Sequence, residues 1–171
     1  MPAVVDEAGD VPVLAAGGIA DGRGLAAALV LGAQAVNIGT RFLACSEAGI
    51  ANEWQEAILR AGSDEPVKLA FADAVFPPAA PGGYRTLPRA LPTDFVERWN
   101  ADPDGAATAG ERLRGELIEA ARAGRGHELV PFTGQTAGLI NEILPAGEIV
   151  RRMLEEAERA GVSPTALPAE G

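Results

Sequence analysis

Apolar residues in the first third of the chain alternate between short continuous runs and stretches with helical spacing. Residues 11–16 (VPVLAA) and 35–38 (AVNI) are continuous runs, each followed by a glycine turn. Such runs are typical of strands that are covered on both faces, as in a parallel sheet. Between them, residues 22–32 have helical spacing behind Asp21, a predicted N-cap. With a second helix expected over 46–61, the order predicts a βαβα unit with two parallel strands.

The second half of the chain has shorter apolar segments and more breaks. Its predicted elements are an irregular stretch with one short strand (67–76), an ordered extended surface loop rich in proline (77–92), and four helices (93–100, 108–123, 134–144 and 145–160). Thr108 and Glu111 form the expected capping box of the second of these helices. The expected division of the chain is 1–62, 63–105, 106–161 and a flexible tail, 162–171.

Composition restricts the possible classes of function. Asp and Glu number 24 and Lys and Arg 14, a net charge of −10, and such an acidic surface repels nucleic acid and anionic lipid. The single cysteine, Cys45, and the single histidine, His127, cannot form a disulfide framework or a metal cluster. No apolar run approaches the ~20 residues that cross a bilayer, and no signal peptide pattern is present. We therefore expect a cytoplasmic protein of one domain's length, without metal, nucleic acid or membrane partners.

The chemical signal that stands out is the pair of glycine turns, residues 15–19 (AAGGI) and 37–40 (NIGT). Each follows a predicted strand and precedes a predicted helix. Glycine lets backbone N–H groups approach an anion closely, and a helix N-terminus adds unsatisfied donors. Two such turns on adjacent parallel strands predict a phosphate site, and Thr40 could add a hydroxyl donor. The alternative is that both turns serve packing alone.

These motifs resemble a known family. Residues 11–50 (VPVLAAGGIADGRGLAAALVLGAQAVNIGTRFLACSEAGI) are similar to the C-terminal part of the nitronate monooxygenases, formerly called 2-nitropropane dioxygenases, and residues 134–158 (GQTAGLINEILPAGEIVRRMLEEAE) to that family's end. The resemblance implies an FMN-binding TIM barrel that oxidises alkyl nitronates with molecular oxygen. This α/β chain would be its C-terminal portion, the last two βα units with a mostly helical C-terminal region. Flavin-dependent enoyl-acyl-carrier-protein reductases share both motifs and are the alternative.

The resemblance also implies which residues hold the cofactor. In the family, the two turns bind the FMN phosphate. Carried over to this sequence, the cofactor-binding residues are Gly17, Gly18, Asn37, Ile38, Gly39 and Thr40. Family members often have Gln-Met-Gly-Thr at the second turn. Asn-Ile-Gly-Thr differs at the first two positions, which alters a side chain near the cofactor and leaves the backbone contacts possible.

By the same resemblance, the match begins at the seventh strand of the barrel. The N-terminal half and the family's catalytic histidine are then absent, and residues 1–10 are the end of the preceding helix. His127 lies among charged residues and is not assigned as the base. No catalytic residue is predicted, and the isolated chain is expected to be inactive. On this resemblance we expect one of three explanations: a fragment or wrong-start gene model, a chain that pairs with another chain or copy to complete the barrel, or a non-catalytic remnant.

Three side chains near the motifs have two possible roles each. Arg41 could contact the phosphate or form an ion pair with Glu47. Cys45 follows the second turn at a predicted helix start, which would favour a thiolate, but the resemblance makes it a packing position and it is expected to be a small buried hydrophobe. Gln135 could line a flavin pocket or cap a short helix.

Overall fold

The computed structural model describes residues 1–76 and 87–163, and these form two compact units. The first unit combines residues 1–48 with the C-terminal segment from Leu139, and the second spans residues 49–138. This division is structural, and the four-part division expected from the sequence stays a prediction. Within the described ranges, no helix is both long and apolar enough to cross a membrane.

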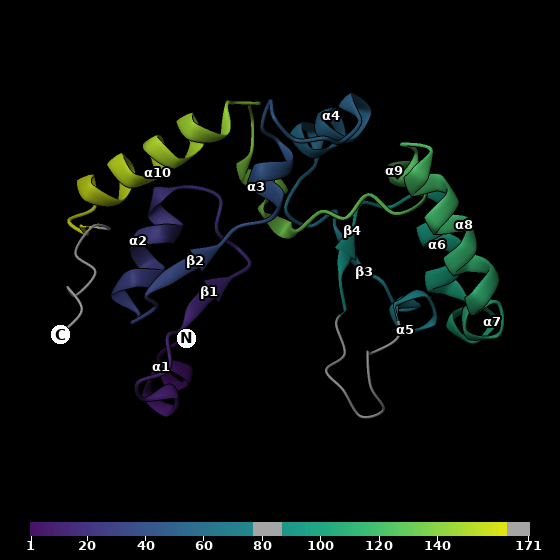
Figure 1. The fold of residues 1–171 in the computed structure, drawn as a ribbon, viewed down its shortest axis with the longest axis horizontal. Helices are drawn as coiled ribbons and strands as arrows, with labels where there is room; N and C mark the ends of the chain where they lie inside the picture. The colour runs from purple at the N-terminus through teal and green to yellow at the C-terminus, as the bar shows by residue number, and fades with distance from the viewer. Residues whose placement is uncertain (77–86, 164–171) are drawn as a thin grey trace. The chain divides into compact units, whose positions relative to one another are not determined.

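The first unit is a parallel two-stranded sheet with helices packed on it. Its elements are α1 (Pro2–Ala8), β1 (Leu14–Ala16), α2 (Gly22–Val30), β2 (Ala35–Asn37), α3 (Thr40–Leu43) and α10 (Ala146–Arg159). The strands pair in parallel, with α2 as the crossover between them, so the predicted βαβ arrangement is confirmed. The helix α10 lies along α2 although more than a hundred residues separate them in sequence (Figure 1).

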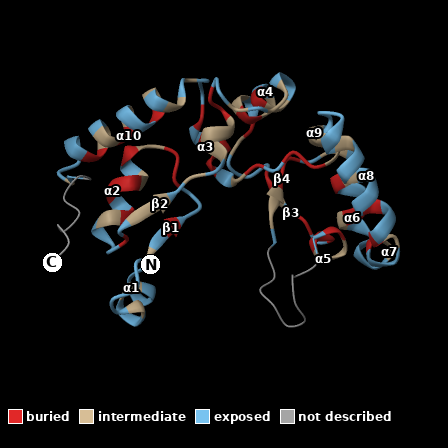
Figure 2. Ribbon diagram, in the orientation of Figure 1, coloured by how far each residue is buried: buried red, intermediate tan, exposed pale blue. Residues whose placement is uncertain are grey.

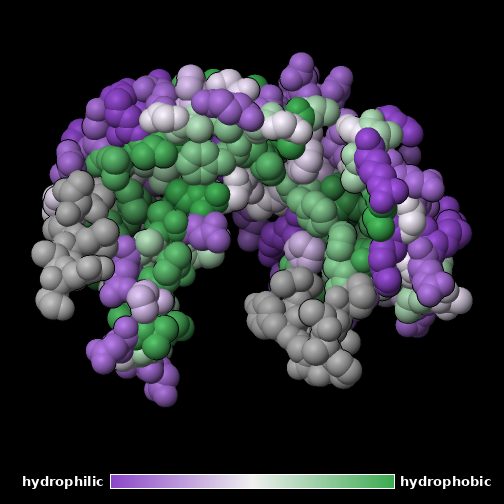
Figure 3. Space-filling view, viewed as in Figure 1, coloured by the Kyte–Doolittle hydropathy of each residue, from purple (hydrophilic) through white to green (hydrophobic). Residues whose placement is uncertain are grey.

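Alanines and a few larger residues form the core of the first unit. Ala15 of β1, Leu25 of α2 and the α10 residues Ile149, Met153 and Ala157 are buried together. Figure 2 shows the buried positions of α2 and α10, while the outer side of α10 is exposed. Hydrophobic residues gather beneath α10, over α2 and β2, in the space-filling view (Figure 3).

The second unit is mainly helical around a small antiparallel pair of strands. Its elements are α4 (Asn52–Arg60), β3 (Val67–Lys68), α5 (Ala72–Val75), β4 (Arg89–Ala90), α6 (Asp94–Ala101), α7 (Pro103–Thr108), α8 (Gly110–Arg122), α9 (Gly126–Leu129) and the 3₁₀ turn η1 (Gln135–Leu139), which ends at the boundary of the units. The strand β3 pairs with β4. Thr93 caps α6, because its hydroxyl oxygen accepts a hydrogen bond from the amide of Val96 at 3.1 Å.

Several predicted boundaries were wrong. The helix expected from residue 46 begins only at Asn52, and the short helix expected over 134–144 is reduced to η1. Thr108 does not cap α8. It ends α7, and its hydroxyl donates to the carbonyl of Asp104 at 3.1 Å, a local bond that competes with capping.

The proline-rich segment was expected to be an extended loop over 77–92. Residues 77–86 lie outside the described residues, and Arg89–Ala90 form a strand where a loop was expected. The predicted final helix is confirmed as α10, with Pro145 at its N-cap. Most of the predicted tail, 164–171, also lies outside the described residues.

Candidate phosphate-binding site

The strand register brings the two glycine turns to one edge of the sheet. Ala16, the last residue of β1, lies opposite Asn37, the last residue of β2. Because the strands are parallel, both chains leave the sheet on the same side, and Gly17 starts its turn beside Ile38. Carboxyl ends of adjacent parallel strands are where ligands of α/β folds bind. The structure therefore brings together the two turns that the sequence singled out.

The first turn has a backbone that favours glycine. Gly17 and Gly18 have φ angles of 85° and 77°, in the left-handed region that L side chains rarely adopt. Both residues are exposed, and a Cβ built on either would have no heavy atom within 4 Å. Among the turn, loop and cap hydrogen bonds of the described residues, none is donated by either amide. The turn thus presents accessible backbone and open space, which fits an anion such as phosphate.

The N-terminus of α2 does not supply the free donors that the sequence predicted. Asp21 accepts hydrogen bonds from the amides of Arg23 at 3.0 Å and Gly24 at 3.2 Å. The amide of Gly22 donates to the carboxylate of Glu156 on α10 at 2.7 Å. Partial burial raises the pKa of Asp21, but its bonds from Arg23 and from the backbone outweigh that effect and lower it. Two carboxylates therefore occupy this helix end, and a phosphate would have to bind the turn before it.

The second turn leads directly into α3. Asn37 and Gly39 are exposed, and a Cβ on Gly39 would meet no atom within 4 Å. The carbonyl of Gly39 accepts hydrogen bonds from the amides of Phe42 at 2.9 Å and Leu43 at 3.3 Å. These bonds fix the turn to α3, whose first residue is Thr40. The backbone of the second turn is thus open to solvent on one side and held by a helix on the other.

Arg41 is buried, with 6% of its surface exposed. Its Nη2 donates to the carbonyls of Ala44 at 3.0 Å and Glu142 at 2.9 Å, and its Nε is buried without a partner. Burial lowers the pKa of Arg41, partly opposed by the nearby Glu142 carboxylate. The alternative ion pair with Glu47 is not formed, because both oxygens of Glu47 accept from the amide of Ala146, at 3.0 and 2.9 Å.

The segment before α10 is joined to the segment after α3 along several residues. Cys45 and Leu144 form a parallel bridge, and the amide of Ser46 donates to the carbonyl of Leu144 at 3.1 Å. With the Arg41 bond to Glu142 and the Glu47 bond to Ala146, this connects 41–47 to 142–146. We call residues 142–146 the C-terminal strap. Cys45 is buried beneath these contacts, as expected.

Sequence reasoning missed two carboxylates that organise this unit. Glu47 caps the start of α10, and Glu156 caps the start of α2. Each lies 99 or 134 positions from the amide that it binds, so no local spacing could have identified it. Gln135 lies in the second unit, and its side-chain amide donates to the carbonyl of Ser63 at 3.4 Å. His127 is half-buried in α9 of the same unit.

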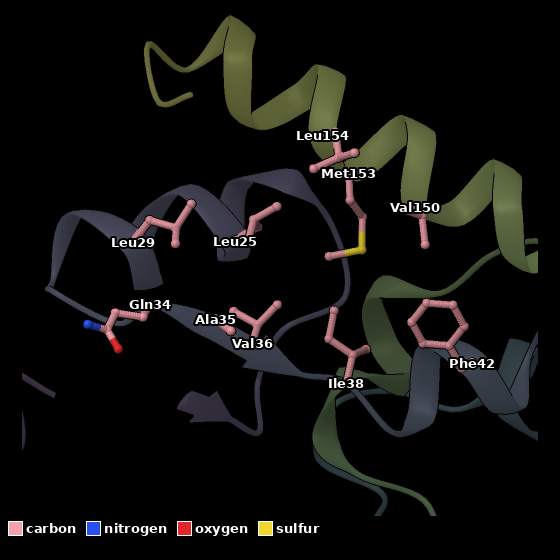
Figure 4. Close-up of a pocket in the computed structure, with 10 residues that line it drawn as sticks. All are labelled: Leu25, Leu29, Gln34, Ala35, Val36, Ile38, Phe42, Val150, Met153 and Leu154. Carbon is pink, nitrogen blue, oxygen red and sulfur yellow. The ribbon is translucent and has the colours of Figure 1, made fainter. Parts of the chain in front are cut away.

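An apolar groove of about 380 Å³ lies within the first unit, beside the free edge of β2 (Figure 4). In that view Met153 points from α10 toward Ile38 and Val36, while Val150 points toward Phe42 at one end. Its full lining is Leu25, Leu29, Gln34, Ala35, Val36, Ile38, Phe42, Val150, Met153 and Leu154.

The comparison with known proteins finds the same family that the sequence motifs resemble. The profile of the nitronate monooxygenase family matches residues 1–156. The nitronate monooxygenase npaC of Metarhizium robertsii is 37% identical over 167 residues, which cover 92% of this chain and 45% of that protein.

Two solved structures also match most of this chain. FabK from Thermotoga maritima has a TM-score of 0.74 and 32% identity, and the match covers 94% of this chain and 48% of FabK. A nitroalkane oxidase from Streptomyces ansochromogenes has a TM-score of 0.66 and 31% identity, and the match covers 94% of this chain and 43% of that one. The chain thus spans less than half the length of each protein that it matches here.

Proposed function

Because this chain belongs to the nitronate monooxygenase family, we propose that its two glycine turns bind the phosphate group of FMN. The residues that would hold the phosphate are Gly17, Gly18, Asn37, Ile38, Gly39 and Thr40. The observation that carries this proposal is the parallel register, which starts both turns at one edge of the sheet. The exposed backbone of Gly17, Gly18 and Gly39 leaves room for an anion there.

The donors proposed here are backbone amides of the turns themselves. The first amides of α2 are occupied by Asp21 and Glu156, so they are not part of the proposed cradle. An amide cradle needs little positive charge from side chains. This is compatible with a chain whose net charge is −10.

We further propose that β1 and β2 are the last two strands of a TIM barrel. In that arrangement the free edge of β2 and the apolar groove beside it would be covered by a barrel segment from a longer chain, a partner chain or a second copy. An uncovered parallel edge and an exposed apolar groove both favour association.

The activity that we propose for the assembled barrel is oxidation of alkyl nitronates with molecular oxygen. When bound, FMN would supply the electron transfer, and the residues of this chain would bind and orient its phosphate end. We assign no catalytic residue to this chain. His127, half-buried in the second unit, is not proposed as the base.

Titration of the 171-residue chain with FMN and with riboflavin tests the phosphate site. The two flavins differ by the phosphate, so we expect FMN to bind more tightly. Gly18→Ala should weaken FMN binding about tenfold, because a Cβ at a φ of 77° strains the turn. Gly124→Ala is the matched control, since Gly124 has a φ of 72° but lies in the second unit. Equal affinity for both flavins in the wild type would rule out the phosphate site.

The second candidate activity is the flavin-dependent enoyl reduction that the sequence also resembles. The TM-score to FabK, 0.74, exceeds that to the nitroalkane oxidase, 0.66, so likeness in fold does not single out nitronate oxidation. The two activities separate by consumption of NADH or NADPH, which the reductase requires and the oxidase does not. A chain that binds FMN but turns over neither substrate would be a non-catalytic subunit or remnant.

A further inference from the structure

Arg41 is the side chain of the first unit whose burial most needs an explanation. A buried guanidinium is costly unless its N–H groups are paired. Here one nitrogen, Nη2, donates to the carbonyls of Ala44 and Glu142, and Nε is left buried without a partner. Leaving the Nε donor buried without a partner costs free energy, so the hydrogen bonds that Arg41 does make must compensate for that cost.

The bonds of Arg41 connect the second turn with a segment near the C-terminus. Arg41 follows Thr40 directly and lies within α3, whose amides from Phe42 and Leu43 hold the carbonyl of Gly39. The guanidinium then reaches the carbonyl of Glu142 in the C-terminal strap, 101 positions away in sequence. A continuous path of bonded groups therefore runs from the strap through Arg41 and α3 to Gly39.

We propose that Arg41 is a positioning residue that holds the second turn in place for the phosphate of FMN. It acts through α3 and makes no contact with the cofactor itself. The inference rests on the proposed function, because it concerns the same phosphate site. The amides of both turns must point at the same phosphate. Displacing either turn therefore weakens the binding of that phosphate.

The geometry also predicts which substitution preserves this role. Both bonds come from a single nitrogen, and a lysine ammonium carries three donors on one nitrogen. Lysine at this position also removes the unsatisfied Nε. Arg41→Lys should therefore retain much of the effect, whereas Arg41→Met keeps the apolar stem and loses every donor.

The test is the ratio of riboflavin Kd to FMN Kd for wild type, Arg41→Met, Arg41→Lys and Arg159→Met. Arg159 is an exposed arginine of α10 in the same unit and serves as the matched control. We expect Arg41→Met to lower the ratio about tenfold, the size of a lost hydrogen bond to a charged group. Arg41→Lys should recover most of it, and Arg159→Met should leave it unchanged. A general loss of structure would weaken both flavins together and leave the ratio intact.

The outcomes separate the two proposals. A wild type that does not favour FMN over riboflavin overturns the phosphate site, and this inference with it. A wild type that favours FMN, with an unchanged ratio in a folded Arg41→Met variant, overturns the role of Arg41 alone. If Arg41→Met does not fold, Arg41→Leu, which also lacks every donor, replaces it, and an unchanged ratio there overturns the role equally. The alkylation rate of Cys45, buried under the strap, should rise in Arg41→Met and return toward the wild-type rate in Arg41→Lys.

Discussion

The two structural units bury their apolar side chains to different degrees. In the second unit, Leu69, Phe71, Val96 and Leu113 are large and at most 1% exposed. In the first unit, half of the buried core residues are alanines, and Leu14 of β1 is 57% exposed. The second unit thus encloses a core of its own, whereas the first presents apolar surface at its sheet.

The difference in exposed apolar surface follows from the size of the side chains in each core. A core of large side chains seals itself, because each buries much apolar area. A unit built from alanine and glycine permits close approach of α2 and α10 but has few large groups to cover the strands. The first unit therefore leaves apolar surface exposed at its strands, whereas the second covers its own core.

The largest expected effect comes from truncating a large side chain in the core of the second unit. Phe71→Ala should destabilise that unit by about 3–5 kcal/mol, because it leaves a cavity among side chains that cannot collapse fully. Both tryptophans, Trp54 and Trp99, lie in the second unit, so their fluorescence during urea unfolding reports on it. A change below about 1 kcal/mol would show that this core is not closed.

A smaller effect is expected where α2 meets α10 in the first unit. A Cβ on Gly22 would overlap the Cβ of Glu156 and the backbone of Met153. Gly22→Ala should therefore cost about 1–3 kcal/mol, as overpacking does, and should displace the carboxylate of Glu156 from the amide that it caps. Faster alkylation of Cys45, a residue of the same core, would measure the loosening.

Gly147→Ala is the matched control for that substitution. Gly147 lies in α10, and a Cβ on it would meet no atom within 4 Å. Alanine in place of an unconstrained helical glycine stabilises by about 0.5–1 kcal/mol. If both variants behaved alike, the close contact between α2 and α10 would not limit the stability of this unit.

Lowering the pH should gradually reduce the stability of α10. Hydrogen bonds from Arg151, and then from Arg152, lower the pKa of Glu148 to about 2 from its ordinary value of 4.5. The folded pKa lies below the unfolded one, so the stabilisation is complete above the unfolded value and is lost as pH falls toward 2. The difference in Tm between wild type and Glu148→Gln should be largest near neutral pH and close on acidification. A constant difference would mean that this network of ion pairs does not stabilise the helix.

The sequence predicted those features of the first unit that depend on neighbouring residues. The parallel strands and the Asp21 cap of α2 follow from patterns within a few positions, and the structure confirms them. The burial of Cys45 was expected from the family resemblance, and the structure confirms it as well. The same local reasoning placed both glycine turns after strands. The positions of both turns could therefore be predicted from sequence, whereas the phosphate site itself stays a proposal.

Features that depend on distant residues could not be predicted. The helix expected from residue 46 starts at Asn52, and Glu47, which looked like part of its first turn, binds the amide of Ala146 instead. The donors expected at α2 are occupied by Asp21 and by Glu156, which lies 134 positions from Gly22. Local propensity cannot anticipate a tertiary partner that competes for the same group.

The smallest expected effect tests the open side of the first unit. Leu14 is 57% exposed on β1, so Leu14→Ala should change the free energy of unfolding by less than about 0.5 kcal/mol in an isolated chain. A second copy or partner covering the strands would bury Leu14, and the same substitution would then cost more, by an amount that grows with protein concentration. Unfolding of wild type and Leu14→Ala at two concentrations separates these cases. A small, concentration-independent difference would leave the first unit open as described, and a large, concentration-dependent one would show that another chain completes its sheet.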